Sequence, residues 1–174
     1  ADAAVFLGSD LSTYMTGAQM VIDGGLINQE LRVTNKRCQE MSDQYQDQLA
    51  IRALLERYCE GVNQRDADIW GGTWAAEAVW ELPHLGMDGL KGRETIVGAW
   101  LEAMKMFPFV NMMAMPGSIC VDGDRATMRS YTDEVAVTQD GTELRPRGQY
   151  DDECVKVDGQ WQFSRRVFTV LHGE

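Results

Sequence analysis

The chain has 174 residues, of which 44% are hydrophobic and 25% charged, a composition typical of a single globular domain with a sizeable core. The net charge of −11 at pH 7 opposes binding to nucleic acid and to anionic membranes, so we expect neither partner. No apolar run approaches the roughly 18 residues of a membrane span, and no signal-peptide pattern opens the sequence. We therefore expect a cytoplasmic protein.

The first 41 residues combine a helix–strand pattern with a polar segment. Residues 1–8 have helical spacing, and residues 18–23 (AQMVID) indicate a short buried strand that ends at Gly24 and Gly25. The polar composition of residues 26–41 is typical of a linker, helical in part. We therefore expect an N-terminal helix–strand extension and a linker.

A long helix is predicted next. Ser42 or Asp43 is the candidate N-cap. Behind them, apolar residues recur at intervals of three and four residues, namely Leu49, Ile51, Leu54, Leu55, Tyr58 and Val62. This spacing predicts an amphipathic helix with one face in the core.

Two more helices and a strand precede Pro108. Asp66 is the candidate N-cap of a short second helix that breaks near Gly71. A strand is predicted over residues 79–82, followed by a turn-rich segment, and residues 93–107 have the spacing of a third amphipathic helix.

Four long strands are predicted after Pro108. They cover residues 109–122, 125–138, 143–157 and 160–171, and the glycine-bearing turns DGD, QDGT and VDGQ separate them. Three helices followed by such strands predict an α+β domain, a cone-shaped curved antiparallel sheet wrapped around three N-terminal helices. A cone of this kind forms a pocket as readily as a core.

The opening stretch ADAAVFLGSDLSTYMTGAQMVIDGG resembles the C-terminal end of short-chain dehydrogenases. The resemblance covers residues 1–25 alone, and the chain has neither a glycine-rich dinucleotide loop after a first strand nor a Y-x-x-x-K pair. We interpret residues 1–25 as a remnant of that family and expect no NAD(P)-dependent dehydrogenase activity.

Residues 42–172 resemble the SnoaL-like branch of the NTF2-like superfamily, with its cystatin-like α+β barrel. The resemblance rests on IRALLERYCEGVNQRDADIWGGTWAAEAVWEL, LKGRETIVGAWLE, VDGDRATMRSYTDEV and RGQYDDECVKVDGQWQFSRRV. It implies a SnoaL-like domain over 42–174, a homodimer or higher homo-oligomer, no cofactor, and proton transfer on a small hydrophobic molecule. Relatives include scytalone dehydratase, bile-acid 7α-dehydratase and a dehydrochlorinase, with polyketide cyclases and ketosteroid isomerases more distant.

The family's Asp–His pair is missing from both of its expected positions. Counting from neighbouring motifs puts the Asp position at Asn63 and the His position at Met112. The second histidine that some relatives have falls near Met113 or Met115. An asparagine cannot act as a carboxylate base. Methionine adapts to irregular apolar shapes, so we expect these three methionines to line a pocket or the core.

Two other side chains are the candidate proton-transfer groups. Tyr58 matches a pocket tyrosine of several relatives, although a tyrosine here can also be a core residue with a backbone partner. Glu134 matches an acidic position of the bile-acid dehydratase. Strand alternation puts it on one face with Met128, Ser130 and Thr132. Inside the cone, Glu134 would be a buried base, whereas a slip by one residue would turn it to water.

The remaining candidate residues are expected to line the substrate pocket or to support the fold. Ser130 and Thr132 share the expected inner face, and Trp74 and Trp80 are expected in the pocket wall or the core. His84 lies in a turn, either solvated or at the site. The two arginines of the last strand, Arg165 and Arg166, are expected to pair with acids at a subunit interface.

Two functions follow from these residues. The first is a cofactor-independent lyase or isomerase, acting on a hydrophobic cyclic substrate such as a steroid or polyketide, with Glu134 as base, Tyr58 as donor and Asn63 as an orienting group. The second is a non-catalytic hydrophobic-ligand-binding or assembly module that has lost the Asp–His pair. A pocket with a buried carboxylate favours the first, and a purely apolar one the second. Neither requires a metal, and two histidines far from four scattered cysteines indicate no metal site.

Overall fold

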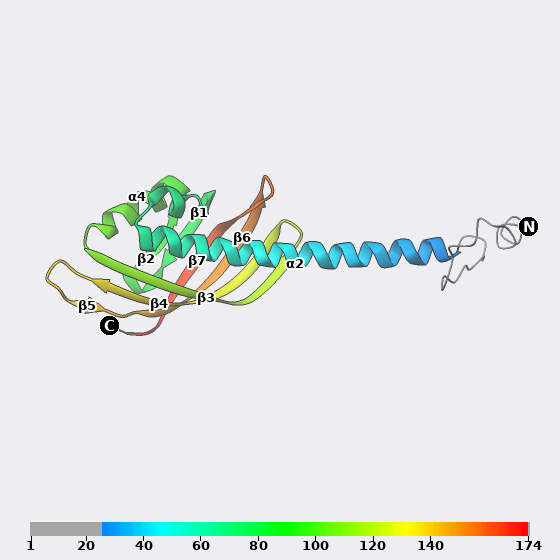
Figure 1. Ribbon diagram of the computed structural model, residues 1–174. Helices are drawn as coiled ribbons and strands as arrows, with labels where there is room; N and C mark the ends of the chain where they lie inside the picture. Colours follow the sequence, from blue (N-terminus) through cyan, green and yellow to red (C-terminus); the bar gives the residue numbers. More distant parts are fainter. Residues whose placement is uncertain (1–25, 174) are drawn as a thin grey trace, which may run out of the picture. The chain divides into compact units, whose positions relative to one another are not determined.

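The structure is a computed structural model that describes residues 26–173, and residues 44–174 form one compact unit (Figure 1). The dehydrogenase-like segment 1–25 lies outside the described residues. Helix α2 spans Leu26–Gln64, so the prediction that Ser42 or Asp43 starts it is wrong. Residues 26–60 contain no Pro or Gly, and the Glu, Gln, Arg and Lys among them favour helix. No residue in this stretch therefore interrupts the helix between Leu26 and Ser42.

Two short helices follow, with strands between them. Helix α3, Ala67–Gly71, has Asp66 as its N-cap, as predicted, and the carboxylate accepts hydrogen bonds from the N–H groups of Asp68 and Ile69. Strand β1, Trp74–Leu82, is longer than predicted, and the expected turn region contains the 3₁₀ helix η2, Pro83–Leu85, and strand β2, Met87–Lys91. Helix α4 spans Arg93–Met104.

The four predicted long strands are confirmed. Strands β3 (Phe109–Asp122), β4 (Arg125–Val137), β6 (Arg147–Val157) and β7 (Gln160–His172) pair as antiparallel neighbours, and the short β5 (Glu143–Leu144) pairs with β4. The sheet order is β2-β1-β7-β6-β4-β3, and the β1–β7 pair is parallel. The sheet curls strongly beside the C-terminal half of α2, giving the predicted α+β architecture (Figure 1).

The core lies between the inner face of this sheet and the helices. Among the described side chains, α2 contributes five hydrophobic ones to the core: Ile51, Leu54, Leu55, Tyr58 and Val62. Tryptophans pack between α3 and α4, where the rings of Trp70 on α3 and Trp100 on α4 stack with centroids 4.7 Å apart. Trp74 and Trp80 are buried members of the same cluster. This packing anchors the part of α2 that carries Tyr58 and Asn63.

Candidate functional site

The inner face of strand β4 carries the polar side chains of the site. Ser130 and Thr132 are buried, Glu134 is partly buried, and their neighbours Tyr131 and Asp133 are exposed. This alternation confirms the predicted register, in which Glu134 shares the inner face with Ser130 and Thr132. Met112 is directly opposite Glu134 on β3 and is also buried.

The carboxyl group of Glu134 is held in a poorly solvated position. Burial raises the pKa of Glu134 above its usual value of 4.5, and this effect outweighs the Thr132 side chain and the Arg166 cation, which lower it. The main-chain N–H of Glu134 donates to the carbonyl of Pro146 at 3.1 Å, which fixes the backbone here. A carboxylate with a raised pKa is a stronger base than an exposed one.

Tyr58 lies at the centre of the aromatic core. Its ring contacts those of Trp70, Trp74, Tyr150 and Phe163, with centroids 5.5 to 6.3 Å away. Burial raises the pKa of the Tyr58 phenol, although the Arg166 cation and a hydrogen bond with Tyr150 lower it. Tyr58 is therefore a neutral hydroxyl group that can donate a proton or a hydrogen bond.

A buried ion pair lies beside Tyr58. Arg166 on β7 and Asp152 on β6 are opposite each other in the sheet, and the guanidinium donates twice to the carboxylate, at 2.8 and 3.1 Å. Both side chains are completely buried. Arg166 was expected at a subunit interface, but it pairs within its own chain. The pairing of β6 with β7 shifts by one residue between Phe163 and Arg165, and this irregularity turns Arg166, in place of Arg165, to the inner face.

Asn63 and Met112, the positions that match the family's Asp and His, lie together. The Asn63 amide Nδ2 donates to the Met112 carbonyl at 2.9 Å, and Asn63 Oδ1 accepts from the Met112 main-chain N–H at 2.7 Å. Both polar atoms of the Asn63 side-chain amide therefore hold the backbone of β3 against α2. Neither side chain can take up a proton from a substrate at neutral pH.

Replacing Asn63 with Asp is expected to destabilise the fold by about 1–3 kcal/mol, because a carboxylate cannot donate to the Met112 carbonyl and leaves it without that partner. Urea unfolding at pH 7 measures the effect. The matched control is Gln46→Glu, the same change at an exposed position of α2, which should alter the unfolding free energy by less than about 0.5 kcal/mol. Equal effects in the two variants would contradict a specific role for Asn63.

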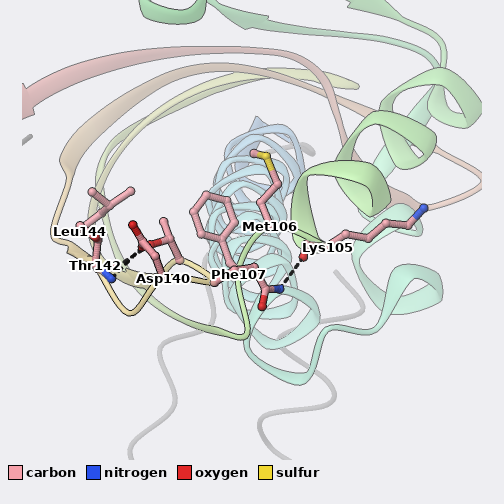
Figure 2. A pocket seen from close by; sticks show the side chains of 8 residues that line it. Lys105, Met106, Phe107, Asp140, Thr142 and Leu144 are labelled. Atoms are coloured by element: carbon pink, nitrogen blue, oxygen red, sulfur yellow. Dashed lines mark hydrogen bonds between the residues drawn. The ribbon is translucent and has the colours of Figure 1, made fainter.

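A cavity of about 690 Å³ opens at one end of this inner face (Figure 2). Leu144, one of its lining residues, pairs with Ala136, two residues beyond Glu134 on the same face of β4. The rise along a strand puts Glu134 roughly 7 Å from that pair. The other lining residues are Lys105, Met106, Phe107, Thr138, Gln139, Asp140 and Thr142.

The cavity walls are mainly apolar and are fixed by hydrogen bonds. Figure 2 shows the Phe107 ring between the β4–β5 loop and α4, with the Lys105 side chain turned away. Gln139 Nε2 donates to the Lys105 carbonyl at 3.0 Å, and Arg65 donates to the carbonyls of Met104 and Phe107. The segment between α4 and β3 is therefore held from both sides, and the cavity suits an apolar molecule of moderate size.

The structure separates the other predicted site residues. Met113 and Met115 lie on the outer face of β3, opposite to Met112, with 63% and 70% of their surface exposed. They line a second cavity, of about 390 Å³, and so do not share a pocket with Met112. Trp74 and Trp80 belong to the core, and His84 is exposed in η2 with its ring 5.3 Å from that of Phe168.

Sequence reasoning missed Tyr150 and Asp152, which sit beside Tyr58 and Arg166. Period-two alternation along β6 was an available signal, because it puts Tyr150, Asp152 and Cys154 on one face. Across the described residues 26–173, no cluster of three or more His, Cys, Asp or Glu side chains could hold a metal ion. Within the same part of the chain, no helix is both long and apolar enough to cross a membrane.

Residues 43–167 match the family model of the SnoaL-like domain, and no curated protein matches the chain. Among solved structures, Kfla4162 from Kribbella flavida is 18% identical with a TM-score of 0.70, and the match covers 75% of this chain and 95% of that one. A variant of Rv3472 from Mycobacterium tuberculosis, described as of unknown function, is 26% identical with a TM-score of 0.63 and 75% coverage of both chains.

A third structure, called a putative scytalone dehydratase from Novosphingobium aromaticivorans, is 20% identical with a TM-score of 0.67. The match covers 77% of this chain and 90% of that one. The likeness to this structure and to Kfla4162 shows a shared fold. Because the family model covers most of the sequence, the chain belongs to the SnoaL-like domain family.

Proposed function

We propose that this protein is a cofactor-independent lyase or isomerase that transfers a proton on a hydrophobic cyclic molecule such as a steroid or polyketide. The observation that carries the proposal is Glu134, an inward-facing carboxyl with a pKa raised by burial, one pair of strand residues from an apolar cavity. Proton abstraction next to a carbonyl requires such a base. The structural likeness to a protein called a putative scytalone dehydratase adds support.

In this proposal each group has a separate task. Glu134 removes the proton, and the Tyr58 hydroxyl donates to the oxygen on which negative charge develops. Asn63 orients the site indirectly, through the backbone of Met112. Met112 is buried directly opposite Glu134, and Ser130 and Thr132 are buried on the same face of β4, so we assign these three side chains to substrate binding next to the base.

The test is a pH titration of Glu134 by carbon-detected NMR of labelled carboxyl groups, assigned with Glu134→Gln. We expect a midpoint above the usual value of 4.5. Proton exchange of cyclic ketones in D₂O should then fall by at least about 100-fold in Glu134→Gln. The matched control Glu60→Gln, at an exposed position of α2, should leave exchange unchanged. A midpoint at or below the usual value would remove the base from the proposal.

The same variant has a second, independent readout. Because the folded state raises the pKa of Glu134, its stabilising contribution is complete below the usual value of 4.5 and is lost as pH rises through the folded-state pKa. Glu134→Gln should therefore resist urea better than the wild type at pH 7 and equally well near pH 4. If Glu134→Gln unfolds at a lower urea concentration than the wild type at pH 7, Glu134 is not a buried charged carboxylate in the folded protein.

A second candidate function is a non-catalytic module that binds a hydrophobic ligand. The observation that favours it is that Asn63 and Met112 occupy the Asp and His positions and are bonded to each other. Such a module should bind an apolar fluorescent probe with the same affinity in the wild type and in Glu134→Gln, and should show no proton exchange with either protein.

We also propose that two copies associate through the outer face of the sheet. This face exposes Met113, Met115 and Tyr131. Its charges are balanced by the cross-strand pairs Arg129–Asp151 and Arg147–Asp133, so two copies can approach despite the net charge of −11. Methionine, aromatic and arginine side chains are enriched at protein interfaces, and this face presents all three kinds.

Light scattering should give twice the subunit mass of 19.5 kDa for the wild type and a lower mass for Met115→Asp. Leu101→Asp, at another exposed apolar residue on α4, is the control and should leave the mass unchanged. A single-subunit mass for the wild type at high concentration contradicts this proposal.

A further inference from the structure

Arg166 is a charged group in the most enclosed part of the domain. Its side chain is completely buried, and transferring an ion out of water costs several kcal/mol that its partners must offset. The Asp152 carboxylate accepts two hydrogen bonds from the Arg166 side chain, and the Ser130 hydroxyl lies 3.4 Å from Arg166 Nη2. Nη1 is also buried, yet it has no hydrogen-bond partner among the described residues.

Aromatic rings surround the same guanidinium. Its central carbon lies 4.2 Å from the centroid of the Tyr58 ring, 3.9 Å from that of Tyr150 and 4.0 Å from that of Phe163. These are close cation–π contacts in a desolvated place, where they are strongest. The cation is thus in contact with the faces of the two phenols, which are hydrogen-bonded to each other.

Stability alone does not account for this arrangement. A buried ion pair is often no more stabilising than well-packed hydrophobic residues of similar volume, and this one leaves a buried donor unsatisfied. What a hydrophobic replacement cannot supply is a fixed positive charge. Such a charge stabilises any negative charge that develops on a neighbouring hydroxyl or carboxyl group.

Two groups of the proposed reaction lie within the field of this charge. Tyr58 is in direct contact with it, and Glu134 follows Ser130 and Thr132 on the same face of β4. The other titratable groups around the guanidinium are Asp152, Tyr150, Cys59 and Cys154. Asp152 is the one that is hydrogen-bonded to the guanidinium, and it fixes the orientation of Arg166.

We propose that Arg166, oriented by Asp152, is a positioning residue whose single buried charge serves both halves of the proton transfer. The inference rests on the proposed function. The cation beneath the phenol rings strengthens Tyr58 as a hydrogen-bond donor to a developing oxyanion. It also holds Glu134 in the ionised form that can accept a proton, although the surroundings of that carboxyl are poorly solvated.

The test compares two matched pairs of substitutions. Arg166→Met with Asp152→Leu removes the buried pair without leaving an unpaired charge. Arg129→Met with Asp151→Leu removes an exposed pair with the same 2.8 Å contact on the outer face of the sheet. The readouts are the titration midpoints of Glu134 and Tyr58 by NMR, without any substrate.

We expect both midpoints to move to higher pH in the variant without the buried pair and to stay in place in the variant without the exposed pair. Unchanged midpoints in a folded variant without the buried pair overturn the proposal. If that variant does not fold, the wild type provides the measurement. The nitrogen resonances of the Arg166 side chain should shift at the titration midpoint of Glu134, and this shift should vanish in Glu134→Gln. Arg166 resonances that do not respond to Glu134 overturn the proposal.

These measurements separate the two claims. If the wild type shows no proton exchange, the proposed function fails, while the titrations still decide whether Arg166 acts on Tyr58 and Glu134. If exchange is present, the variant without the buried pair should lose kcat with little change in KM, and Arg166→Lys, which keeps the charge, should restore part of kcat. Lost exchange with unmoved midpoints assigns Arg166 a purely structural role.

Discussion

Replacing Asp152 with Ala is expected to reduce the free energy of unfolding by about 3–5 kcal/mol, because it leaves the guanidinium of Arg166 buried without a counter-charge. The loss of the carboxylate removes both of its hydrogen bonds to Arg166. The three surrounding aromatic rings prevent the side chain from reaching water without a rearrangement of the core. Urea unfolding at pH 7, followed by circular dichroism, measures the change.

The adjacent residue Asp151 provides the control for this substitution. It also pairs with an arginine at 2.8 Å, but on the solvent side of the same strand, where about half of each side chain is exposed. Asp151→Ala should cost no more than about 1 kcal/mol, since exposed ion pairs contribute little. Similar losses in the two variants would falsify the view that burial, rather than pairing, sets the effect.

Replacing Gly61 with Ala is expected to destabilise the protein by about 3 kcal/mol, because the added methyl group would meet the backbone of α3. A Cβ atom at this position would lie 2.7 Å from N, Cα and Cβ of Trp70, well inside normal contact distance. The Trp70 backbone can retreat only if the ring leaves its stacked position against Trp100. Near-ultraviolet circular dichroism and thermal unfolding should both report the change.

Gly98 is the matched control, since it is also a helical glycine but has no atom within 4 Å of an added Cβ. Gly98→Ala should stabilise the protein by about 0.5–1 kcal/mol through its helix preference. A neutral effect of Gly61→Ala would show that α2 and α3 separate more easily than their contact suggests.

The sequence predicts the fold well where signals are local. The turns DGD and VDGQ place glycines at Gly123 and Gly159, whose φ angles of 56° and 77° favour glycine, and strands begin and end beside them as predicted. The cap at Asp66 was equally readable. The start of α2 could not be predicted from the sequence, because a capping residue inside a run of helix-forming residues does not require the helix to begin there.

The site was predictable only in part, since it depends on contacts between distant segments. Alternation along β4 places Glu134 inside the cone, and the same rule applied to β3 would have separated Met112 from Met113 and Met115. The pairing of Arg166 with Asp152 follows from the register of β6 against β7, which no local pattern determines. The rings around the guanidinium come from two strands and a helix, so only the packed structure shows them.

The amide of Asn63 has a further consequence, for association between sheets. Strand β3 is an edge of the sheet, and an edge strand offers unpaired backbone groups to any other chain in solution. Asn63 occupies the N–H and the carbonyl of Met112, two backbone groups of this edge, and Pro116, four residues further along, has no N–H to offer. The opposite edge, β2, is only five residues long and ends at Lys91. Each edge thus has features that oppose strand addition, which should reduce aggregation of the folded protein at high concentration.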